Sequence, residues 1–252
     1  VWEYCVCVNE TAHSEIFTLT LHDALPVYIR SGGDEAPKMR WEKCPKCQQM
    51  ISDKGIVAGN KQSKEDRLQG YFATEVQKYL AAKGRKIIGW DELLECNVDQ
   101  SATIMSWRGA EPGAQAAALG HDVIMTPNSH AYFDYYQTAN NHNEPLLIGG
   151  DLPIEKTYSF EPIPEGTPAE AGKHILGVQA NLWSEYIVSE SLAEYQVLPR
   201  MCALSEVQWM QPAQKDFKSF VKRVECLRAI YELKGYADAK HLWPEEHLKG
   251  SR

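Results

Sequence analysis

Two carboxylates that could form a catalytic pair, Asp34 and Glu35, directly follow Gly32 and Gly33. Adjacent residues of a regular strand point to opposite faces, so both carboxylates can reach one substrate only if a strand ends here. The glycines permit that departure, because they adopt backbone conformations that other residues avoid. One carboxyl group can then stay protonated as an acid while the other stays ionised. The alternative is ordinary capping of a helix that has Pro37 in its first turn.

Three tryptophans accompany charged residues farther along the chain. Trp90 and Trp107 each precede a charged side chain, and Trp183 lies two residues before Glu185. A buried tryptophan usually belongs to a core, and each of the three taken alone fits that role. Together they predict an aromatic pocket with a polar rim, which suits the apolar faces and the hydroxyl groups of a sugar.

Tyr132 and Asp134 lie in an aromatic segment, residues 129–136. In an extended segment, residues of the same parity face the same way, so this phenol and this carboxylate would lie side by side. That combination suits recognition of a hydroxyl or an amide group. The alternative is an aromatic loop that packs on the rest of the protein.

The cysteines do not indicate a metal site. Cys44 and Cys47 have the spacing of half a zinc site, but no second pair of cysteines or histidines follows at a suitable distance. A local disulfide or two free thiols are therefore favoured over a metal. The sequence also has no phosphate-binding glycine loop, and we expect neither a metal nor an organic cofactor.

The elements that position these residues can be read from the hydrophobic pattern. Leu68, Tyr71, Phe72, Val76, Tyr79 and Leu80 have helical spacing, which predicts an amphipathic helix that buries them and ends near Gly84. Further helices are expected at residues 114–119 and 217–230. The expected strands are residues 28–29, 86–90, 102–107, 122–126 and 175–183.

This alternation of strands and helices predicts an α/β protein with a parallel sheet. Four of the strands end in clusters rich in polar and aromatic residues, G-G-D-E, G-W-D-E, S-W-R-G and N-L-W-S-E. A (β/α)8 barrel builds its active site at the carboxyl ends of its strands, whereas a flavodoxin-like sheet binds ligands at one switch point. The pattern therefore favours an incomplete (β/α)8 barrel, of which this chain holds about the last five β/α units.

The composition disfavours several classes of partner. The 252 residues are 44% hydrophobic and 24% charged, as in an ordinary globular protein. A formal net charge of -8 without a cluster of Lys and Arg argues against nucleic acid and anionic membranes. No apolar run is long enough to insert into a bilayer, and no signal peptide is visible. The sequence indicates no oligomeric state.

Taken together, the motifs resemble glycoside hydrolase family 20, the β-N-acetylhexosaminidases. The resemblance extends from about Gly32 to Trp209 and lies in the order of the motifs. These are G-G-D-E-A-P-K at 32–38, I-G-W-D-E at 88–92, S-W-R-G at 106–109, Y-F-D-Y-Y-Q at 132–137, G-V-Q-A-N-L-W-S-E at 177–185 and L-P-R-M-C-A-L-S-E at 198–206.

The resemblance implies three catalytic residues. Glu35 would protonate the leaving oxygen and later activate water, while the 2-acetamido carbonyl of the substrate itself attacks the anomeric carbon to give an oxazolinium ion. Asp34 would orient the acetamido group and stabilise its positive charge. Tyr132 would donate a hydrogen bond to the acetamido oxygen.

The resemblance also implies the sugar-binding residues and the partner. Trp90, Trp107 and Trp183 would form the walls around the terminal sugar, and Asp134 and Glu185 would hold its hydroxyl groups. The partner would be a glycan, and the full-length protein would be periplasmic or secreted.

Residues 1–31 depart from the family pattern, and we assign them no function. The family carries a helix and then a strand that ends in H-x-G-G-D-E, whereas residues 9–31 resemble a translated sequencing adapter and Arg30 replaces the histidine. Residues 32–252 would be the C-terminal part of the catalytic barrel. The family's early strands, and an arginine on them that grips the outer hydroxyls of the sugar, are absent from this chain.

Two other functions remain open on the sequence. One is a (β/α)8 glycosidase that uses two direct carboxylates, for example Glu35 and Glu185. The other is a sugar-binding remnant that has kept its pocket and lost catalysis.

Overall fold

The computed structural model describes residues 27–59, 62–96, 98–138 and 144–240. The chain divides into two compact units. Of the described residues, unit 1 holds those up to Ser106 together with Pro112–Ile124 and Pro168–Ile175. Unit 2 holds the described residues of Trp107–Glu111 and Met125–Thr167 and those from Leu176 to Lys240. Within the described ranges, no helix has the length and apolar character needed to cross a membrane.

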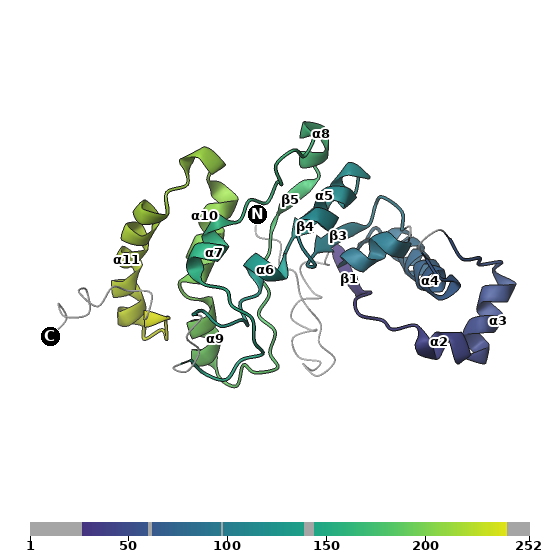
Figure 1. Ribbon diagram of the computed structural model, residues 1–252, viewed down its shortest axis with the longest axis horizontal. Coiled ribbons are helices and arrows are strands. Elements are labelled where there is room, and N and C mark those ends of the chain that lie inside the picture. The colour runs from purple at the N-terminus through teal and green to yellow at the C-terminus, as the bar shows by residue number, and fades with distance from the viewer. Residues whose placement is uncertain (1–26, 60–61, 97, 139–143, 241–252) are drawn as a thin grey trace. The chain divides into compact units, whose positions relative to one another are not determined.

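The described residues contain a five-stranded sheet with the strand order β1-β2-β3-β4-β5 (Figure 1). The strands are β1 (Tyr28–Gly32), β2 (Lys86–Trp90), β3 (Thr103–Ser106), β4 (Val123–Met125) and β5 (Ile175–Val178). β1 pairs in parallel with β2, and β2 with β3, with Tyr28 opposite Lys86 and Ile88 opposite Thr103. All five expected strands are confirmed, although β5 ends at Val178, earlier than its apolar pattern indicated.

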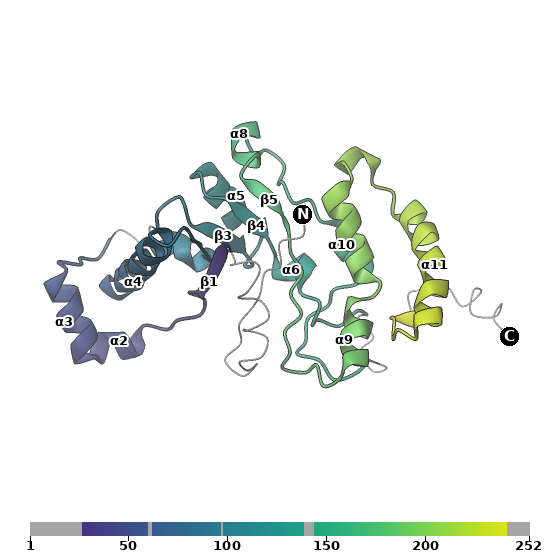
Figure 2. The same cartoon turned by 180° about the vertical axis from the view of Figure 1, so that it is seen from behind.

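Helices follow the strands, as the sequence predicted (Figures 1 and 2). Those before β4 are α2 (Met39–Lys43), α3 (Pro45–Asp53), α4 (Lys64–Ala81), the 3-10 helix η1 (Asp91–Cys96) and α5 (Glu111–Ala118). The later helices are α6 (Asn128–Ala131), α7 (Ile154–Ser159), α8 (Ala169–Gly172), α9 (Glu190–Val197), α10 (Arg200–Trp209), the 3-10 helix η3 (Pro212–Gln214) and α11 (Phe217–Lys234). The three helices expected from the sequence correspond to α4, α5 and α11.

The start of α4 is fixed by a capping box. The Ser63 hydroxyl accepts a hydrogen bond from the backbone N–H of Asp66 at 3.0 Å, and the Asp66 carboxylate accepts one from the backbone N–H of Ser63 at 2.9 Å. Two backbone donors that a helix leaves unpaired at its first turn are thereby satisfied.

The buried face of α4 differs from the one that its hydrophobic spacing predicted. Leu68 is buried as expected, but Phe72 and Tyr79 are 65% and 64% exposed. The buried face carries Gly70 and Gln77 instead, because α4 packs so closely on η1 that a Cβ on Gly70 would overlap a backbone carbonyl oxygen there. The face of α4 that packs on η1 therefore carries a glycine and hydrogen-bonding amides, and the rings of Phe72 and Tyr79 remain exposed.

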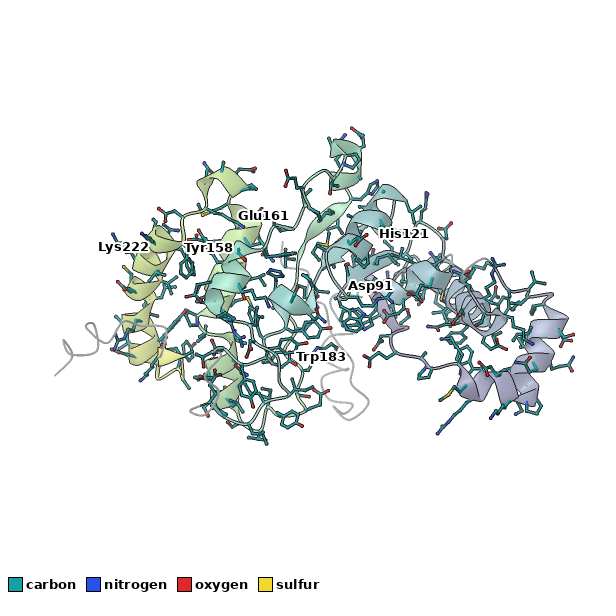
Figure 3. The ribbon with its side chains drawn as sticks, in the orientation of Figure 1. Asp91, His121, Tyr158, Glu161, Trp183 and Lys222 are labelled. Atoms are coloured by element: carbon teal, nitrogen blue, oxygen red, sulfur yellow. The ribbon has the colours of Figure 1, made fainter. Side chains whose placement is uncertain are left out.

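The core of unit 2 lies among α7, α10 and α11. Tyr158 of α7, labelled in Figure 3, stacks on Phe220 of α11 with ring centroids 4.7 Å apart. The other members of this cluster are Ile154, Ala203 and Val224. The side chain of Asp216 accepts from the N–H of Ser219 at the start of α11, and Gly235 ends the helix in the left-handed conformation. Helix α10 contributes Ala203 to this core, between residues of α7 and α11.

Candidate active site

Asp34 and Glu35 lie in unit 1, directly beyond the carboxyl end of β1. The strand ends at Gly32, and both Gly32 and Gly33 have positive φ angles, 67° and 106°. The first helix after the pair, α2, begins only at Met39, so the alternative interpretation of a helix cap is wrong. Both carboxylates are exposed. The chain thus leaves the strand at the place where the sequence analysis required it to end.

Glu35 itself has a strained backbone. Its φ is 46°, which places it in the left-handed region that residues with a Cβ normally avoid at a cost of about 1 to 2 kcal/mol. Backbone strain of this kind is concentrated at functional sites, where the surroundings hold a side chain in a required direction. A structural role alone would be served better by glycine at this position.

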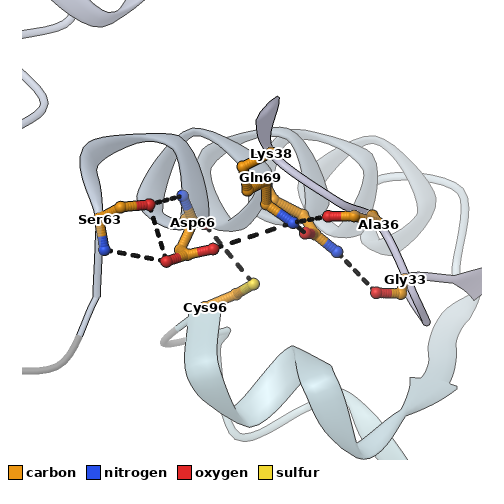
Figure 4. A network of polar contacts seen from close by, with 7 residues as sticks. All are labelled: Gly33, Ala36, Lys38, Ser63, Asp66, Gln69 and Cys96. Carbon is orange, nitrogen blue, oxygen red and sulfur yellow. Dashed lines mark hydrogen bonds and ion pairs between the residues drawn. The ribbon is translucent and has the colours of Figure 1, made fainter. Parts of the chain in front are cut away.

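A hydrogen-bond network behind the turn holds it in place (Figure 4). The Gln69 amide of α4 donates to the carbonyl oxygen of Gly33 at 2.7 Å. The Lys38 ammonium donates to the carbonyl oxygen of Ala36 at 2.5 Å and to the side-chain oxygen of Gln69. Sequence reasoning gave neither Lys38 nor Gln69 a role. Lys38 could have been found, since it ends the G-G-D-E-A-P-K motif, but nothing in the sequence singles out Gln69.

Trp90 is buried at the end of β2, also in unit 1. The guanidinium carbon of Arg30 lies 4.0 Å from the centroid of its ring, in the range of a cation–π contact. Arg30 is the residue that replaces the family's histidine. It therefore contacts Trp90, one of the predicted sugar-binding tryptophans.

The remaining predicted site residues lie in unit 2, where Tyr132 is the centre of an aromatic cluster. Its ring stacks on Trp107 with centroids 6.4 Å apart, and meets Trp183 edge-on at 6.1 Å and Tyr135 at 5.6 Å. Trp183 lies on the segment that follows β5 and is labelled in Figure 3. Burial raises the pKa of Tyr132, so its phenol keeps its proton and remains a hydrogen-bond donor. The structure therefore brings together two of the three tryptophans around the tyrosine.

The segment after Tyr132 is a turn, and the extended geometry assumed from the sequence is wrong. Tyr132 forms an isolated bridge with Asn181, the N–H of Phe133 donates to the Asn181 carbonyl at 2.7 Å, and the chain then turns at Asp134. Strand pairing is therefore limited to two isolated bridges, at Tyr132 and at Tyr136, with the turn between them.

Asp134 is a buried acid that no side-chain donor of the described residues pairs. The residue is 4% exposed, and neither carboxylate oxygen receives a side-chain hydrogen bond from the described part of the chain. Burial raises the pKa of the Asp134 carboxyl to about 6, and the negative charge of Glu185 adds to this, while the nearby backbone N–H groups of Asp134 and Trp183 and the Arg200 guanidinium oppose it. Glu185 itself is exposed. An unsatisfied buried acceptor suits a ligand that supplies donors, such as sugar hydroxyl groups.

Asp134→Asn should therefore stabilise the folded protein at neutral pH. The folded-state pKa of about 6 exceeds the ordinary aspartate pKa of 3.8, so the ionised group disfavours folding at every pH above its unfolded pKa. We expect Asn to raise the free energy of unfolding by about 2 kcal/mol at pH 7. The gain should shrink as pH falls from about 6 to about 4 and vanish below that.

Thermal unfolding of the complete protein at a series of pH values checks this prediction. Asp151→Asn, which makes the same chemical change at an exposed position of the same unit, is the matched control. A stability difference for Asp134→Asn that is constant from pH 4 to pH 7 would mean that Asp134 is solvated or paired.

Cys44 and Cys47 are free thiols, which corresponds to one of the two states that the sequence favoured. Cys44 is the N-cap of α3, and hydrogen bonding from Cys47 lowers its pKa, while the same contact raises the pKa of Cys47. In the described ranges, no group of three or more potential ligands could hold a metal ion.

Comparison with known proteins decides the family. The model of "Glycosyl hydrolase family 20, catalytic domain" matches residues 6–212, a span that contains all the predicted site residues. The chain belongs to glycoside hydrolase family 20. A β-hexosaminidase of Porphyromonas gingivalis is 43% identical over 204 residues, which cover 80% of this chain and 25% of that protein. A β-hexosaminidase of Vibrio furnissii is 31% identical over 182 residues, covering 71% of this chain and 28% of that protein.

Solved structures of family 20 share the fold. The exo-β-N-acetylglucosaminidase of Vibrio harveyi, in complex with N-acetylglucosamine, is 29% identical with a TM-score of 0.74, covering 86% of this chain and 33% of that one. A β-N-acetylhexosaminidase of Bacteroides fragilis is 26% identical with a TM-score of 0.66, covering 84% of this chain and 42% of that one. These neighbours are (β/α)8 barrels, so the parallel sheet and its helices are part of such a barrel, as predicted. The chain spans about a quarter of the length of the two curated relatives described above.

Proposed function

We propose that the protein containing this chain hydrolyses terminal, non-reducing β-linked N-acetylhexosamine residues of glycans, with retention of configuration through an oxazolinium intermediate. The observation that carries the proposal is the Asp34–Glu35 pair, which two left-handed glycines place just beyond β1 in a chain of family 20. The glycan would be the partner, and N-acetylglucosamine and N-acetylgalactosamine are both included.

Unit 1 would supply the acid and the charge. Glu35 gives its proton to the glycosidic oxygen as the bond from that oxygen to the anomeric carbon breaks. The acetamido carbonyl oxygen attacks the same carbon and closes the oxazolinium ring, whose positive charge Asp34 stabilises. Water then attacks the anomeric carbon, the bond from that carbon to the acetamido oxygen breaks, and Glu35 takes a proton from the water. The nucleophile is already attached to the substrate, so the protein mainly orients it and stabilises its charge.

Unit 2 would supply the sugar pocket. Tyr132 donates to the acetamido oxygen, for which its raised pKa is favourable because the phenol stays protonated. Trp107 and Trp183 contact the apolar faces of the sugar, as Trp90 of unit 1 would. Asp134 and Glu185 accept hydrogen bonds from the hydroxyl groups, and the buried Asp134 oxygens, which no side-chain donor of the described residues pairs, support that role.

Asp34→Asn and Tyr132→Phe test the proposal directly in the complete protein. Both should lower kcat by about 100- to 1000-fold and change KM far less, because their contacts strengthen only as the oxazolinium forms. The measurement is steady-state hydrolysis of an aryl β-N-acetylglucosaminide. Tyr136→Phe is the matched control, since its hydroxyl accepts a structural hydrogen bond from the N–H of Leu147. If either site variant mainly raised KM with kcat intact, that residue would bind the ground state only.

The two alternatives predict different results. A glycosidase with two direct carboxylates would cleave a substrate that lacks the 2-acetamido group, and a thiazoline mimic of the oxazolinium would not inhibit it. A binding remnant would bind N-acetylglucosamine without turnover. Family resemblance also favours a periplasmic or secreted location, which fractionation of cells that express the complete protein would test.

A further inference from the structure

Arg200, the first residue of α10, has no part in the catalytic scheme above. It belongs to the L-P-R-M-C-A-L-S-E motif at 198–206, to which the proposed reaction assigns nothing. Its side chain is fully buried, at 0% exposed, and it is among the largest buried side chains in the described part of the protein. A buried guanidinium is costly to the fold unless its donors are paired, so the pairing it makes is informative.

The guanidinium donates its hydrogen bonds to backbone carbonyls of the turn that carries the sugar-site residues. Nη2 donates to the Phe133 carbonyl at 2.5 Å, and Nη1 donates to the Tyr135 carbonyl at 3.2 Å. Nη1 also donates to the carbonyl of Leu152 at 3.1 Å. The guanidinium carbon lies 4.8 Å from the ring centroid of Phe133. The two turn carbonyls belong to the residues on either side of Asp134.

Helix α9 completes the coordination of the guanidinium. Nε and Nη2 of Arg200 donate to the Gln196 carbonyl at 2.9 and 2.7 Å, and Nη2 donates to the Gln196 side-chain oxygen at 3.0 Å. A planar fork with several donors can join carbonyls from separate segments in this way, whereas the compact ammonium of lysine cannot.

The far end of the same turn is held by an acid. The Glu144 carboxylate accepts from the backbone N–H of Gln137 at 3.0 Å and from that of Thr138 at 2.6 Å. The Gln137 side chain donates to the Tyr195 carbonyl of α9 at 2.6 Å. Arg200 therefore acts on the part of the turn nearest Tyr132 and Asp134, and Glu144 on the part beyond it.

We propose that Arg200 is a positioning residue, which holds the turn of residues 132–136 so that Tyr132 and Asp134 keep the geometry needed for the acetamido group and the sugar hydroxyls. The inference rests on the proposed function for its catalytic consequence. Its structural part, the clamp on the turn, can be tested without any turnover.

Arg200→Lys keeps the positive charge and removes the fork. In the complete protein, we expect kcat for an aryl β-N-acetylglucosaminide to fall by about 10- to 100-fold, since a small misplacement of a catalytic contact has an effect of that size. KM should change much less. Backbone hydrogen exchange of residues 133–137 should become faster than in the unaltered protein, while exchange in α11 should not.

Two variants serve as controls for folding and for chemistry. Leu204→Ala, a buried position of the same helix α10, lowers stability through a cavity but should keep the kcat of the folded protein and the slow exchange of residues 133–137. Arg223→Lys makes the same chemical change at the exposed ion pair with Glu206 and should leave both quantities unchanged. Gln196→Leu removes one acceptor only and should lower kcat in the same direction as Arg200→Lys, which keeps the test available if Arg200→Lys does not fold.

The outcomes separate the two proposals. Wild-type kcat together with wild-type exchange of residues 133–137 in Arg200→Lys, or in Gln196→Leu if only that variant folds, would overturn the positioning role. Faster exchange of the turn in a protein that never hydrolyses a β-N-acetylhexosaminide would leave the clamp standing and overturn the proposed function.

Discussion

Glu35→Gln is expected to reduce hydrolysis of chitobiose by about 100- to 10,000-fold, the range that a positioned general acid contributes. Glutamine has nearly the same shape but has no proton of suitable acidity to give. The loss should be much smaller for an aryl glycoside with an acidic phenol as leaving group, because such a group departs without protonation.

A series of aryl β-N-acetylglucosaminides with phenols of increasing pKa checks this in the complete protein. For Glu35→Gln, log kcat/KM should fall steeply with the pKa of the phenol, whereas the unaltered protein should show a shallow dependence. Glu42→Gln, an exposed glutamate of α2 with no assigned role, is the matched control and should behave as the unaltered protein. Near-normal cleavage of chitobiose by Glu35→Gln would show that Glu35 is not the general acid.

The strained backbone of Glu35 allows its effect on stability to be measured separately from its effect on activity. Because φ at this position is 46°, Glu35→Gly should leave the free energy of unfolding unchanged or raise it, although it removes the acid. Loss of activity in Glu35→Gln and Glu35→Gly alike, with no loss of stability, would place the effect in the chemistry.

The 252-residue chain expressed alone is expected to unfold without a cooperative transition and to lack hexosaminidase activity. Among the described residues, β1 and β5 are the edge strands of the sheet. A closed barrel has no edge strands. Phe72 and Tyr79 on α4 are exposed aromatic rings that a neighbouring barrel element would cover. Both features should be corrected when the upstream part of a family barrel is supplied.

The test is a hybrid in which residues 32–252 of this chain replace the matching segment of the Porphyromonas gingivalis relative. We expect the hybrid to unfold cooperatively and to hydrolyse an aryl β-N-acetylglucosaminide, and the same hybrid with Glu35→Gln to lose activity against chitobiose. A cooperative transition and full activity from the 252-residue chain alone would show that it needs no further barrel units.

Much of the architecture followed from the amino-acid sequence because local signals and the fold agree. The apolar run of Lys86–Trp90 is a strand, and the helical spacing from Leu68 to Leu80 is the helix α4. The glycines before Asp34 indicated that the strand ends there, which depends only on the conformations that glycine allows. The order of the family motifs then indicated which residues are expected to serve the chemistry.

Other features depended on contacts between residues far apart in the chain, which no local pattern contains. Hydrophobic spacing predicted that Phe72 lies in the buried face of α4. Because Gly70 approaches η1 closely, the buried face instead includes Gln69 and Gln77, whose side chains donate to backbone carbonyls. The turn at Asp134 could not be seen either. Its carbonyls are satisfied by Arg200, 67 positions away from Phe133, and a backbone keeps a non-repetitive shape only where such distant donors are present.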